Sequence, residues 1–509
     1  MLKNNELIKK TIQLIAVAIL AKGLGFIREV VLANYYGANY ISDVFVAVQN
    51  IPSIIFTVFG IAITTGFIPI YTELEVKKGK DIADKFANNI FNIFLLISVI
   101  LSILGIIFSN QLVKLFAGGF SGDTLKLCNR FAKIIMPTSV AIILVYVYNA
   151  YLQIEEHFNQ NSLMNIPYNV IQIIFIALSF YIGNVDILAI GLLIASYSQL
   201  MYLRVLIKRK TKFKHEKVLD FKDKNIRNML IIVGPLFIST GINQLNSIID
   251  RSLASGLVEG SVSALNYSSE VSNIITQVII LSLTTILYPK MTKIFMKDNS
   301  KEKNRFTEKY ISIVWLLVLP LSVLIFVFSK EIVRILFARG AFSEENVEFV
   351  SASLRVYAVG IVGASFRDVL NKIFYSMKNT ITPMINGCMA VLVNIILNLI
   401  LVKKYEYIGL AFATSFSSIV CTILLFIQLI RKMNGINIKE IIFECMKISL
   451  ATLVMIIFLI VFNRLIVFKI DIIQCIIGGI LSSMIYACIL LILKENAIYN
   501  LVKSKKESL

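Results

Sequence analysis

The nine residues ITTGFIPIY, 63–71, recur as LTTILYPKM at 283–291, with a Thr-Thr pair and a Pro kept at the same spacing. Two more pairs of segments lie at nearly the same offset. Leu-Ala at 32–33 and Ser at 42 match the same residue types at 253–254 and 263, and LVKLFAGGFS (112–121) matches IVRILFARGAFS (332–343). Three matches at an offset of 220 to 221 residues indicate that the chain contains a duplication.

Both copies lie in a very apolar chain. Of its 509 residues 57% are hydrophobic and 16% are charged, and the mean hydropathy is +0.79, which excludes an ordinary soluble protein. Apolar runs long enough to cross a bilayer as a helix recur along it. We predict about fourteen membrane-spanning helices, at residues 11–33, 43–72, 87–109, 125–152, 161–182, 186–207, 228–256, 263–290, 309–329, 348–375, 381–402, 407–431, 440–462 and 470–493.

The repeat arranges these spans. Spans one to six and seven to twelve form the two copies, and because six is even, both copies begin on the same side of the membrane. Such parallel repeats are typical of transporters. The expected fold is all-α and polytopic, with two lobes and two appended helices. Its expected parts are an N-terminal lobe (1–207), a basic linker (208–227), a C-terminal lobe (228–431) and the appended helices with a tail (432–509).

The net charge of +19 predicts a membrane topology rather than a nucleic-acid partner, because the basic residues lie between spans. The N-terminus, the loops after spans two and eight, the linker and the C-terminal tail are rich in Lys and Arg. All of them fall on one side when the spans alternate. By the positive-inside rule the protein is expected to be a multi-pass protein of the bacterial plasma membrane with both termini cytoplasmic.

Charges inside the predicted spans are candidate functional residues, because a charge in the bilayer is costly unless it faces the protein interior or a wet cavity. Arg28 and Glu29 are adjacent, and the offset of 221 pairs Glu29 with Asp250, which precedes Arg251. Lys22 shares a helix face with Glu29. One interpretation is two structural ion pairs. The other is a cationic cavity for an anionic ligand, since a guanidinium binds two phosphate oxygens at once.

A second candidate site lies in the span 381–402, where Asn394 and Asn398 are four residues apart and share one face. Amide oxygens together with a carboxylate are hard ligands that suit a cation such as Na⁺. Asp250 could supply the carboxylate and Thr414 a hydroxyl. The alternative is hydrogen bonding between helices by the paired amides.

Catalysis has little support in the sequence. The two histidines, His157 and His215, fall in predicted cytoplasmic segments without a partner at catalytic spacing. The six cysteines have no metal-ligand spacing and are expected to pack as small apolar residues. We expect a transporter and not an enzyme, with a membrane-embedded glycosyltransferase as the alternative from a different class.

Three stretches together resemble one family. They are GFIREVVLANYYG followed by SDVFVAVQNIPSIIF, LFARGAFSEENV, and SMKNTITPMINGCMAVLVNIILNLIL followed by GLAFATSFSSIV. Between Gly25 and Arg431 the chain resembles the MurJ/MviN lipid II flippases of the multidrug/oligosaccharidyl-lipid/polysaccharide exporter superfamily. The resemblance implies a fourteen-helix exporter that moves an undecaprenyl-diphosphate-linked peptidoglycan precursor from the inner to the outer leaflet by alternating access. Helices 13 and 14 would hold the lipid tail.

The resemblance also implies site residues. Arg28 and Lys22 match basic positions of the family's central cavity, and with the other charged candidates they give a predicted substrate-binding set of Lys22, Arg28, Glu29, Asp43 and Arg251. A sodium site described for the family maps onto Asp250, Asn394, Asn398, Leu410 through its carbonyl, and Thr414. Sodium as a coupling or structural ion is therefore expected, and no other cofactor.

The chain departs from the family pattern at three positions. Phe56 stands where many relatives carry an arginine, Glu270 lies near the position of another, and Asn398 replaces an acidic sodium ligand. The cavity is therefore expected to be less basic than in the family. A flippase for another polyprenyl-linked glycan, such as a capsule or teichoic precursor, and a cation-coupled multidrug exporter stay as alternatives. The expected partners are a lipid-linked glycan diphosphate, membrane lipids and cell-wall synthesis proteins, and a monomer is expected.

Overall fold

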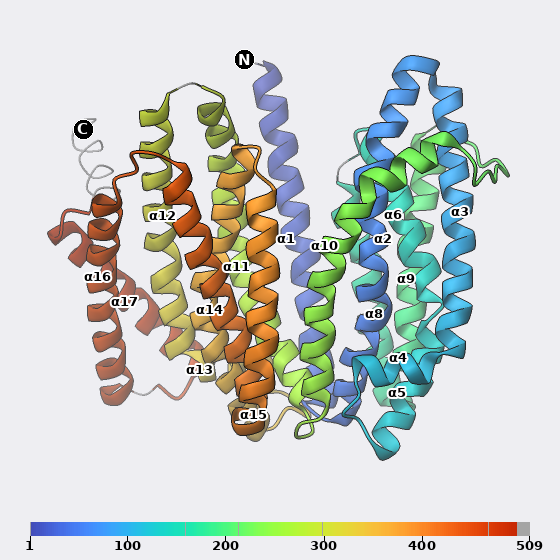
Figure 1. Ribbon diagram of the computed structural model, residues 1–509. Coiled ribbons are helices and arrows are strands. Elements are labelled where there is room, and N and C mark those ends of the chain that lie inside the picture. The colour runs from blue at the N-terminus through green and yellow to red at the C-terminus, as the bar shows by residue number, and fades with distance from the viewer. Residues whose placement is uncertain (1, 158, 212, 298, 467, 496–509) are drawn as a thin grey trace. The chain divides into compact units, whose positions relative to one another are not determined.

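A computed structural model describes residues 2–157, 159–211, 213–297, 299–466 and 468–495 (Figure 1). Within these ranges the regular secondary structure consists of the helices α1 to α17 and includes no strand. A helix satisfies its own backbone N–H and C=O groups, which the hydrocarbon core of a membrane requires of a segment that crosses it. The predicted all-α, polytopic fold class is confirmed.

The chain packs as two units. Unit 1 contains the residues up to Ser263 together with Arg339–Phe342, and unit 2 contains Ala264–Ala338 and the residues from Ser343 onward. The helices of unit 1 are α1 (Leu2–Tyr36), α2 (Tyr40–Lys78), α3 (Lys80–Ile107), α4 (Ser109–Phe116), α5 (Gly122–Ile135), α6 (Thr138–Ile154), α7 (Gln160–Leu163), α8 (Asn165–Ile182), α9 (Asp186–Lys210) and α10 (Lys224–Ser255). Those of unit 2 are α11 (Ser261–Met296), whose first turn lies in unit 1, α12 (Ser300–Val327), α13 (Ser329–Phe337), α14 (Glu344–Ser376), α15 (Ile381–Lys432), α16 (Ile438–Leu465) and α17 (Asp471–Ile492).

This division follows packing, whereas the predicted lobes follow the repeat. The helix α10 packs along α2 and so belongs to unit 1, although the repeat assigns most of it to the second copy. The lobe limits at residues 207, 227 and 431 therefore stay a prediction about the duplication.

The predicted spans coincide with the long helices. In the described residues nine helices are each long and apolar enough to cross a membrane, and the pair α5 and α6, bent by 44°, makes a tenth. The helix α15 holds two predicted spans, which separate at Glu406, where the backbone turns to φ 47 and ψ −131. Pro137 lies at the bend between α5 and α6. A proline favours a bend here because it lacks the N–H of a helical residue and its ring clashes with the preceding turn.

The duplication is visible in the backbone. The short helices α4 and α13 each follow a phenylalanine at the offset of 220, and the two residues have nearly the same dihedral angles. Phe108 has φ −94 and ψ 21, and Phe328 has φ −94 and ψ 20. The copies then differ, since α14 runs unbroken for 33 residues where the first copy bends at Pro137.

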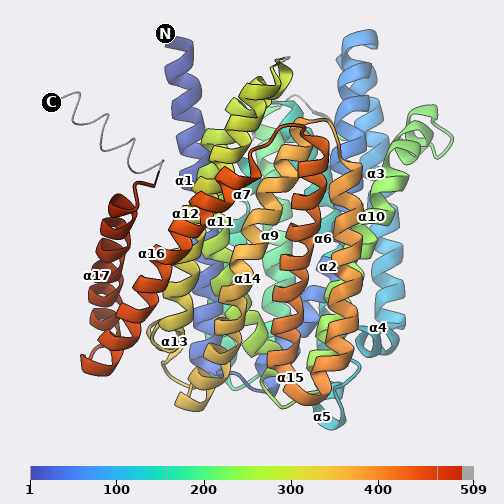
Figure 2. The ribbon, with the colours of Figure 1, turned by 60° about the vertical axis from the view of Figure 1, so that its left-hand side comes forward.

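The two appended helices α16 and α17 pack on α12 and α13 within unit 2, as Figures 1 and 2 show. Their interface is apolar and contains Ile448, Met455 and Leu490. Two hydrogen bonds join them to α12: Trp315 Nε1 donates to Ser449 Oγ over 3.1 Å, and the Tyr486 hydroxyl donates to the Leu316 carbonyl over 2.9 Å.

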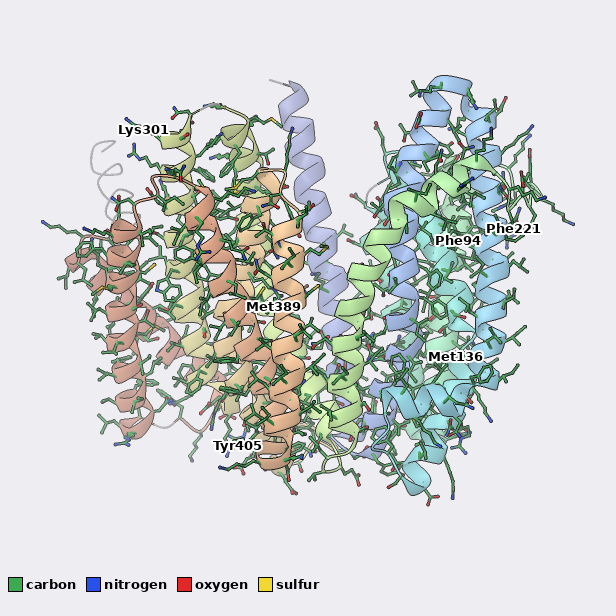
Figure 3. The ribbon with its side chains drawn as sticks, viewed as in Figure 1. Phe94, Met136, Phe221, Lys301, Met389 and Tyr405 are labelled. Atoms are coloured by element: carbon green, nitrogen blue, oxygen red, sulfur yellow. The ribbon has the colours of Figure 1, made fainter. Side chains whose placement is uncertain are left out.

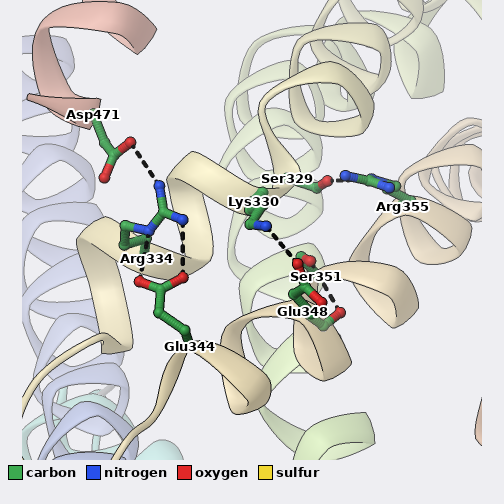
Figure 4. Close-up of polar contacts among 8 residues, drawn as sticks. All are labelled: Ser329, Lys330, Arg334, Glu344, Glu348, Ser351, Arg355 and Asp471. Atoms are coloured by element: carbon green, nitrogen blue, oxygen red, sulfur yellow. Dashed lines mark hydrogen bonds and ion pairs between the residues drawn. The ribbon is translucent and has the colours of Figure 1, made fainter. Parts of the chain in front are cut away.

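An ion-pair clasp fixes the other end of α17 (Figure 4). Arg334 on α13 donates from Nε and Nη2 to the two carboxylate oxygens of Glu344, at 3.0 and 2.9 Å. Its Nη1 donates to Asp471, the first residue of α17, over 3.1 Å. One guanidinium therefore ties the repeated part of unit 2 to the appended helices.

Candidate functional site

The charge pair on α1 is held in place by α8. Arg28 forms an ion pair with Glu29, and its Nη1 also donates to Asn169 Oδ1 over 3.4 Å. The Asn169 amide nitrogen donates to the Asn165 carbonyl, which orients the side chain. The Glu29 side chain is 3% exposed and that of Arg28 is 16% exposed. The acid is therefore buried, while the guanidinium is held in place and partly exposed.

Lys22 precedes this pair by two turns of α1 and is exposed. It lies on the helix face of Glu29, as its spacing predicts. The described structure thus gives α1 one exposed amine and one partly exposed guanidinium along its second half.

Asp43 has a different role from an open substrate ligand. Its buried carboxylate accepts hydrogen bonds from the backbone N–H groups of Gly260 and Ser263 and from the Ser263 hydroxyl, each at 2.7 Å. These bonds cap the first turn of α11. At the equivalent position in the first copy Asn39 caps α2 with its own side chain, whereas Gly260 has no side chain and Asp43 supplies the acceptor.

Two glycines allow the turns around this cap to approach each other closely. Gly260 has φ 88, and a Cβ there would lie 2.6 Å from the Ala38 carbonyl oxygen. Gly340 has φ 58, and a Cβ there would lie 2.3 Å from the Asn34 carbonyl oxygen. The Asn34 carbonyl also accepts from the Ala341 N–H over 2.8 Å. We call these contacts, together with the Asp43 cap, the turn closure of unit 1.

Arg251 lies against α2 in unit 1, where its Nη1 donates to the Val46 carbonyl over 3.4 Å. Its neighbour Asp250 accepts from the Asn246 amide over 3.3 Å. Arg28 therefore contacts α8, and Arg251 contacts α2. The substrate-binding roles of the five predicted residues stay predictions.

The neutral residues of the predicted sodium site do meet within unit 2. Asn398 donates to Asn394 Oδ1 over 2.9 Å, Asn394 donates to the Thr414 hydroxyl over 3.3 Å, and Thr414 donates to the Leu410 carbonyl over 3.1 Å. Asn394 and Asn398 are 1% and 0% exposed. This series of hydrogen bonds is the bonding between helices that the alternative interpretation expects. It also brings four possible oxygen ligands together. Asp250 belongs to unit 1, so the complete ligand set stays a prediction.

One departure from the family pattern has a structural consequence. Phe56 is 2% exposed and belongs to the hydrophobic core of unit 1, where it packs against Phe59. A charged side chain at this position would need a polar environment. The phenylalanine packs in the apolar core instead. Glu270 lies partly buried on α11.

The linker docks on α3, a contact that the sequence analysis does not predict. The side-chain amides of Asn88 and Asn89 on α3 each donate to a backbone carbonyl of the linker and accept from a backbone N–H. These hydrogen bonds are 2.7 to 2.9 Å long and involve Lys214, Glu216 and Asp220. The signal in the sequence is the pair of asparagines at the start of the apolar span 87–109. Phe221, marked in Figure 3, directly follows these contacts. Asn169 was identifiable in the same way, as an amide inside the span 161–182.

His215 anchors this docked linker. Its Nε2 lies 2.9 Å from the Tyr148 hydroxyl, and its ring packs against Phe91 and Phe213 with centroids 4.6 and 5.1 Å apart. Burial, and to a smaller extent the charge of Arg204, lowers the pKa of His215 below its usual value. In the described residues no group of three His, Cys, Asp or Glu side chains is arranged to hold a metal ion.

Comparison with known proteins identifies relatives along most of the chain. A family model described as "Lipid II flippase MurJ" matches residues 32–476. Proteins named "Probable lipid II flippase MurJ" are similar over most of their length. The protein from Buchnera aphidicola subsp. Baizongia pistaciae is 27% identical over 471 residues, 91% of each chain, and that from Vibrio cholerae is 27% identical over 443 residues, 83% of each chain.

Solved structures agree with these relatives. A structure described as "Lipid II flippase MurJ, inward closed conformation" matches with a TM-score of 0.82 and 26% identity, covering 95% of this chain and 99% of that chain. An inward-facing multidrug resistance MATE family transporter of the MOP superfamily matches with a TM-score of 0.70 and 15% identity, over 82% of this chain and 95% of that chain, and shares the fold. The resemblance drawn from the motifs is confirmed, and the chain belongs to the lipid II flippase MurJ family.

Proposed function

We propose that the protein moves a polyprenyl-diphosphate-linked peptidoglycan precursor, lipid II, across the bacterial plasma membrane. The family membership over residues 32–476 is the observation that carries this proposal. The expected sides follow from the charges between spans, so both termini and the linker are proposed to be cytoplasmic. The precursor would then be taken from the inner leaflet. Cell-wall synthesis proteins as partners and a monomeric state stay predictions.

Arg28 is proposed to bind the diphosphate. Its side chain is fixed by Glu29 and Asn169 and is partly exposed. A held guanidinium loses little conformational freedom when an anion binds, and its planar donors match phosphate oxygens. Lys22 would add a second positive charge on the same helix, and Arg251 a third from α10. Asp43 is left out, because its carboxylate caps α11.

The transport cycle is proposed to use the turn closure of unit 1. The Asp43 cap and the glycine contacts join turns of both copies, at the end of the spans that is proposed to face the outside of the cell. Release to the outer leaflet requires that end to open. Opening would break the three hydrogen bonds to Asp43, and these bonds would form again when the transporter returns to its first state. The turn closure therefore favours the state that faces the cytoplasm.

Complementation tests the proposal. The chain is expressed in a strain depleted of its own lipid II flippase, together with an Arg28→Ala, Glu29→Gln double variant. We expect the wild-type chain to restore growth and the double variant to fail at equal membrane abundance. Failure of the inserted wild-type chain, in a strain that a bona fide family member rescues, would favour another polyprenyl-linked glycan as substrate.

A further inference from the structure

A basic cavity lies at one end of unit 2, away from the residues discussed above. It has a volume of about 670 Å³ and is formed where α11, α14 and α15 end and α12 begins. Three lysines on three different elements line it: Lys303 on α12, Lys378 after α14, and Lys432 at the end of α15. A fourth amine, that of Lys372, lies 5.2 Å from the centre of the Tyr288 ring, which forms part of the wall.

The lysines of this cavity are not neutralised by acids in its wall. No Asp or Glu is among the described residues that line it. A separate cavity of about 490 Å³ at this end of unit 2 is lined by Glu302, Glu308, Glu440 and Glu444 together with Arg305 and Lys309. Glu302, the neighbour of Lys303 in the chain, forms an ion pair with Lys297 at 3.0 Å. The acids of that cavity therefore lie beside cations of their own wall, whereas the described wall of the first cavity has lysines without an acid.

The backbone at Lys378 supports a role for its side chain. Lys378 follows α14 with φ 57, in the left-handed region that favours glycine at a helix end. The Asn379 N–H donates to the Phe374 carbonyl over 3.0 Å, which closes the helix end in the usual way for such a residue. Glycine would adopt this conformation at less cost, so lysine is present here at the expense of helix-end stability.

Other wall residues match a ligand that has both a phosphate and an apolar part. The Ser376 hydroxyl is buried and has no hydrogen-bond partner in the described part of the chain, and Asn434 adds an amide. Phe295 and Met377 supply apolar surface. Hydroxyl, amide and ammonium donors suit phosphate oxygens, whereas an acidic peptide would need a longer groove than one cavity.

We propose that this cavity binds a phosphate group, either in the headgroup of an anionic lipid or as soluble inorganic phosphate. The loops that form it fall on the proposed cytoplasmic side, where the leaflet surface is negative and basic pockets between helices hold lipid headgroups. The site contains none of the residues assigned to transport. Its argument rests on the proposed function only for the cytoplasmic side, so a loss of transport and a loss of phosphate binding can be told apart.

The test uses purified full-length protein in neutral detergent. The cavity variant carries Lys303→Gln, Lys378→Gln and Lys432→Gln. The control carries Lys293→Gln, Lys301→Gln and Lys439→Gln, which removes the same charge from exposed lysines outside the cavity wall. Lys301 is marked at this end of unit 2 in Figure 3. Binding of phosphatidylglycerol is measured by native mass spectrometry in competition with phosphatidylcholine.

The cavity variant is expected to bind phosphatidylglycerol at least about tenfold more weakly, since one lysine beside an anionic surface is worth about fivefold. The control is expected to stay within about twofold of the wild type. Equal binding by the wild type and the cavity variant, or an equal loss in the control, would overturn the proposal. If millimolar inorganic phosphate displaces the lipid, phosphate alone is recognised. If only a second anionic lipid displaces it, the lipid headgroup is the ligand.

A single variant guards against misfolding. Lys378→Gly removes one amine and relieves the left-handed conformation, so it is expected to raise the thermal midpoint while weakening phosphatidylglycerol binding about fivefold. A stabilised variant with unchanged binding would count against the site.

Discussion

At the residue scale, the proposed diphosphate site depends on one arginine, Arg28. Arg28 is placed by a buried acid on its own helix and by an amide on α8. The sequence predicts the acid-base pair from its position in an apolar span. It does not predict Asn169 as the partner, because a contact between residues 141 positions apart depends on how α1 and α8 pack.

The loss of transport should depend on which residue replaces Arg28. Arg28→Lys keeps a charge but loses the planar fork, so it should retain part of the activity, whereas the Arg28→Ala, Glu29→Gln double variant should lose it. The second substitution matters because Glu29 is buried, and breaking a buried ion pair costs about 3–5 kcal/mol. Growth of a flippase-depleted strain is the measurement.

Arg130→Ala is the matched control for Arg28. Arg130 pairs with Asp186 at 2.7 Å in the same unit, but its side chain is 56% exposed. This variant should complement normally, since exposed ion pairs contribute about 1 kcal/mol or less. Wild-type growth with the Arg28→Ala, Glu29→Gln double variant would mean that the diphosphate is bound elsewhere.

At the scale of elements, the sequence predicts the long helices well and the short ones poorly. Each predicted span needs only length and apolar content, and these are local properties of about 20 residues. The helices α4 and α13 are eight and nine residues long and mix charged with apolar residues, so they fall below that threshold. The repeat marks them as equivalent segments without predicting their conformation.

The Arg334 clasp is a property of the second copy alone. At the offset of 220 the first copy has Lys114, a point charge that cannot make the same fork of bonds. We expect Arg334→Gln to lower the free energy of unfolding by about 1–2 kcal/mol, because Arg334 bonds two acids and is only partly exposed. Thermal unfolding of the purified protein in detergent measures this loss.

Lys330→Gln is the comparison for the clasp. It breaks the single pair of Lys330 with Glu348, whose side chain is 69% exposed, and should cost less than about 0.5 kcal/mol. An Arg334 variant as stable as the Lys330 variant would mean that apolar packing alone holds α17.

Docking of the linker should depend on pH. Because burial lowers the pKa of His215, the docked linker holds the neutral ring, and the released linker binds protons more readily. The docked state is therefore fully stable above the ordinary histidine pKa of about 6.5 and weakens as the pH falls below it. Hydrogen exchange of residues 213–223, corrected for the intrinsic rate, should be faster at pH 5.5 than at pH 7.5.

His215→Phe isolates the titration, since the ring still packs between Phe91 and Phe213 but carries no proton. Its linker should show the same corrected exchange at both pH values. A pH response that persists in this variant would assign the effect to another group.

At the scale of the whole molecule, the predicted sodium ligands belong to two different units. The predicted sodium ligands Asn394, Asn398, Leu410 and Thr414 lie together in unit 2, while Asp250 lies in unit 1. Residue type and spacing in the sequence suggest Asp250, Asn394, Asn398 and Thr414, and Leu410 enters only through the family resemblance. A cation bound by all five would favour whichever state of the transporter brings the carboxylate to the amides.

Sodium should therefore stabilise the protein weakly, and Asn398→Asp should strengthen the effect by adding an anionic ligand. Asp250→Asn should remove it. Thermal midpoints of purified protein are compared in NaCl and KCl at equal ionic strength. Identical responses of the wild type and Asp250→Asn to both salts would leave the asparagine pair as helix packing.

The central claim is that the chain moves lipid II between leaflets. The most direct measurement places labelled lipid II and purified protein in liposomes and follows how much label an impermeant reagent reaches over time. The account predicts that the wild-type chain exposes the inner pool and that the Arg28→Ala, Glu29→Gln variant does not. An inner pool that stays protected with the wild-type chain, while a capsule or teichoic precursor is exposed in the same liposomes, would contradict it.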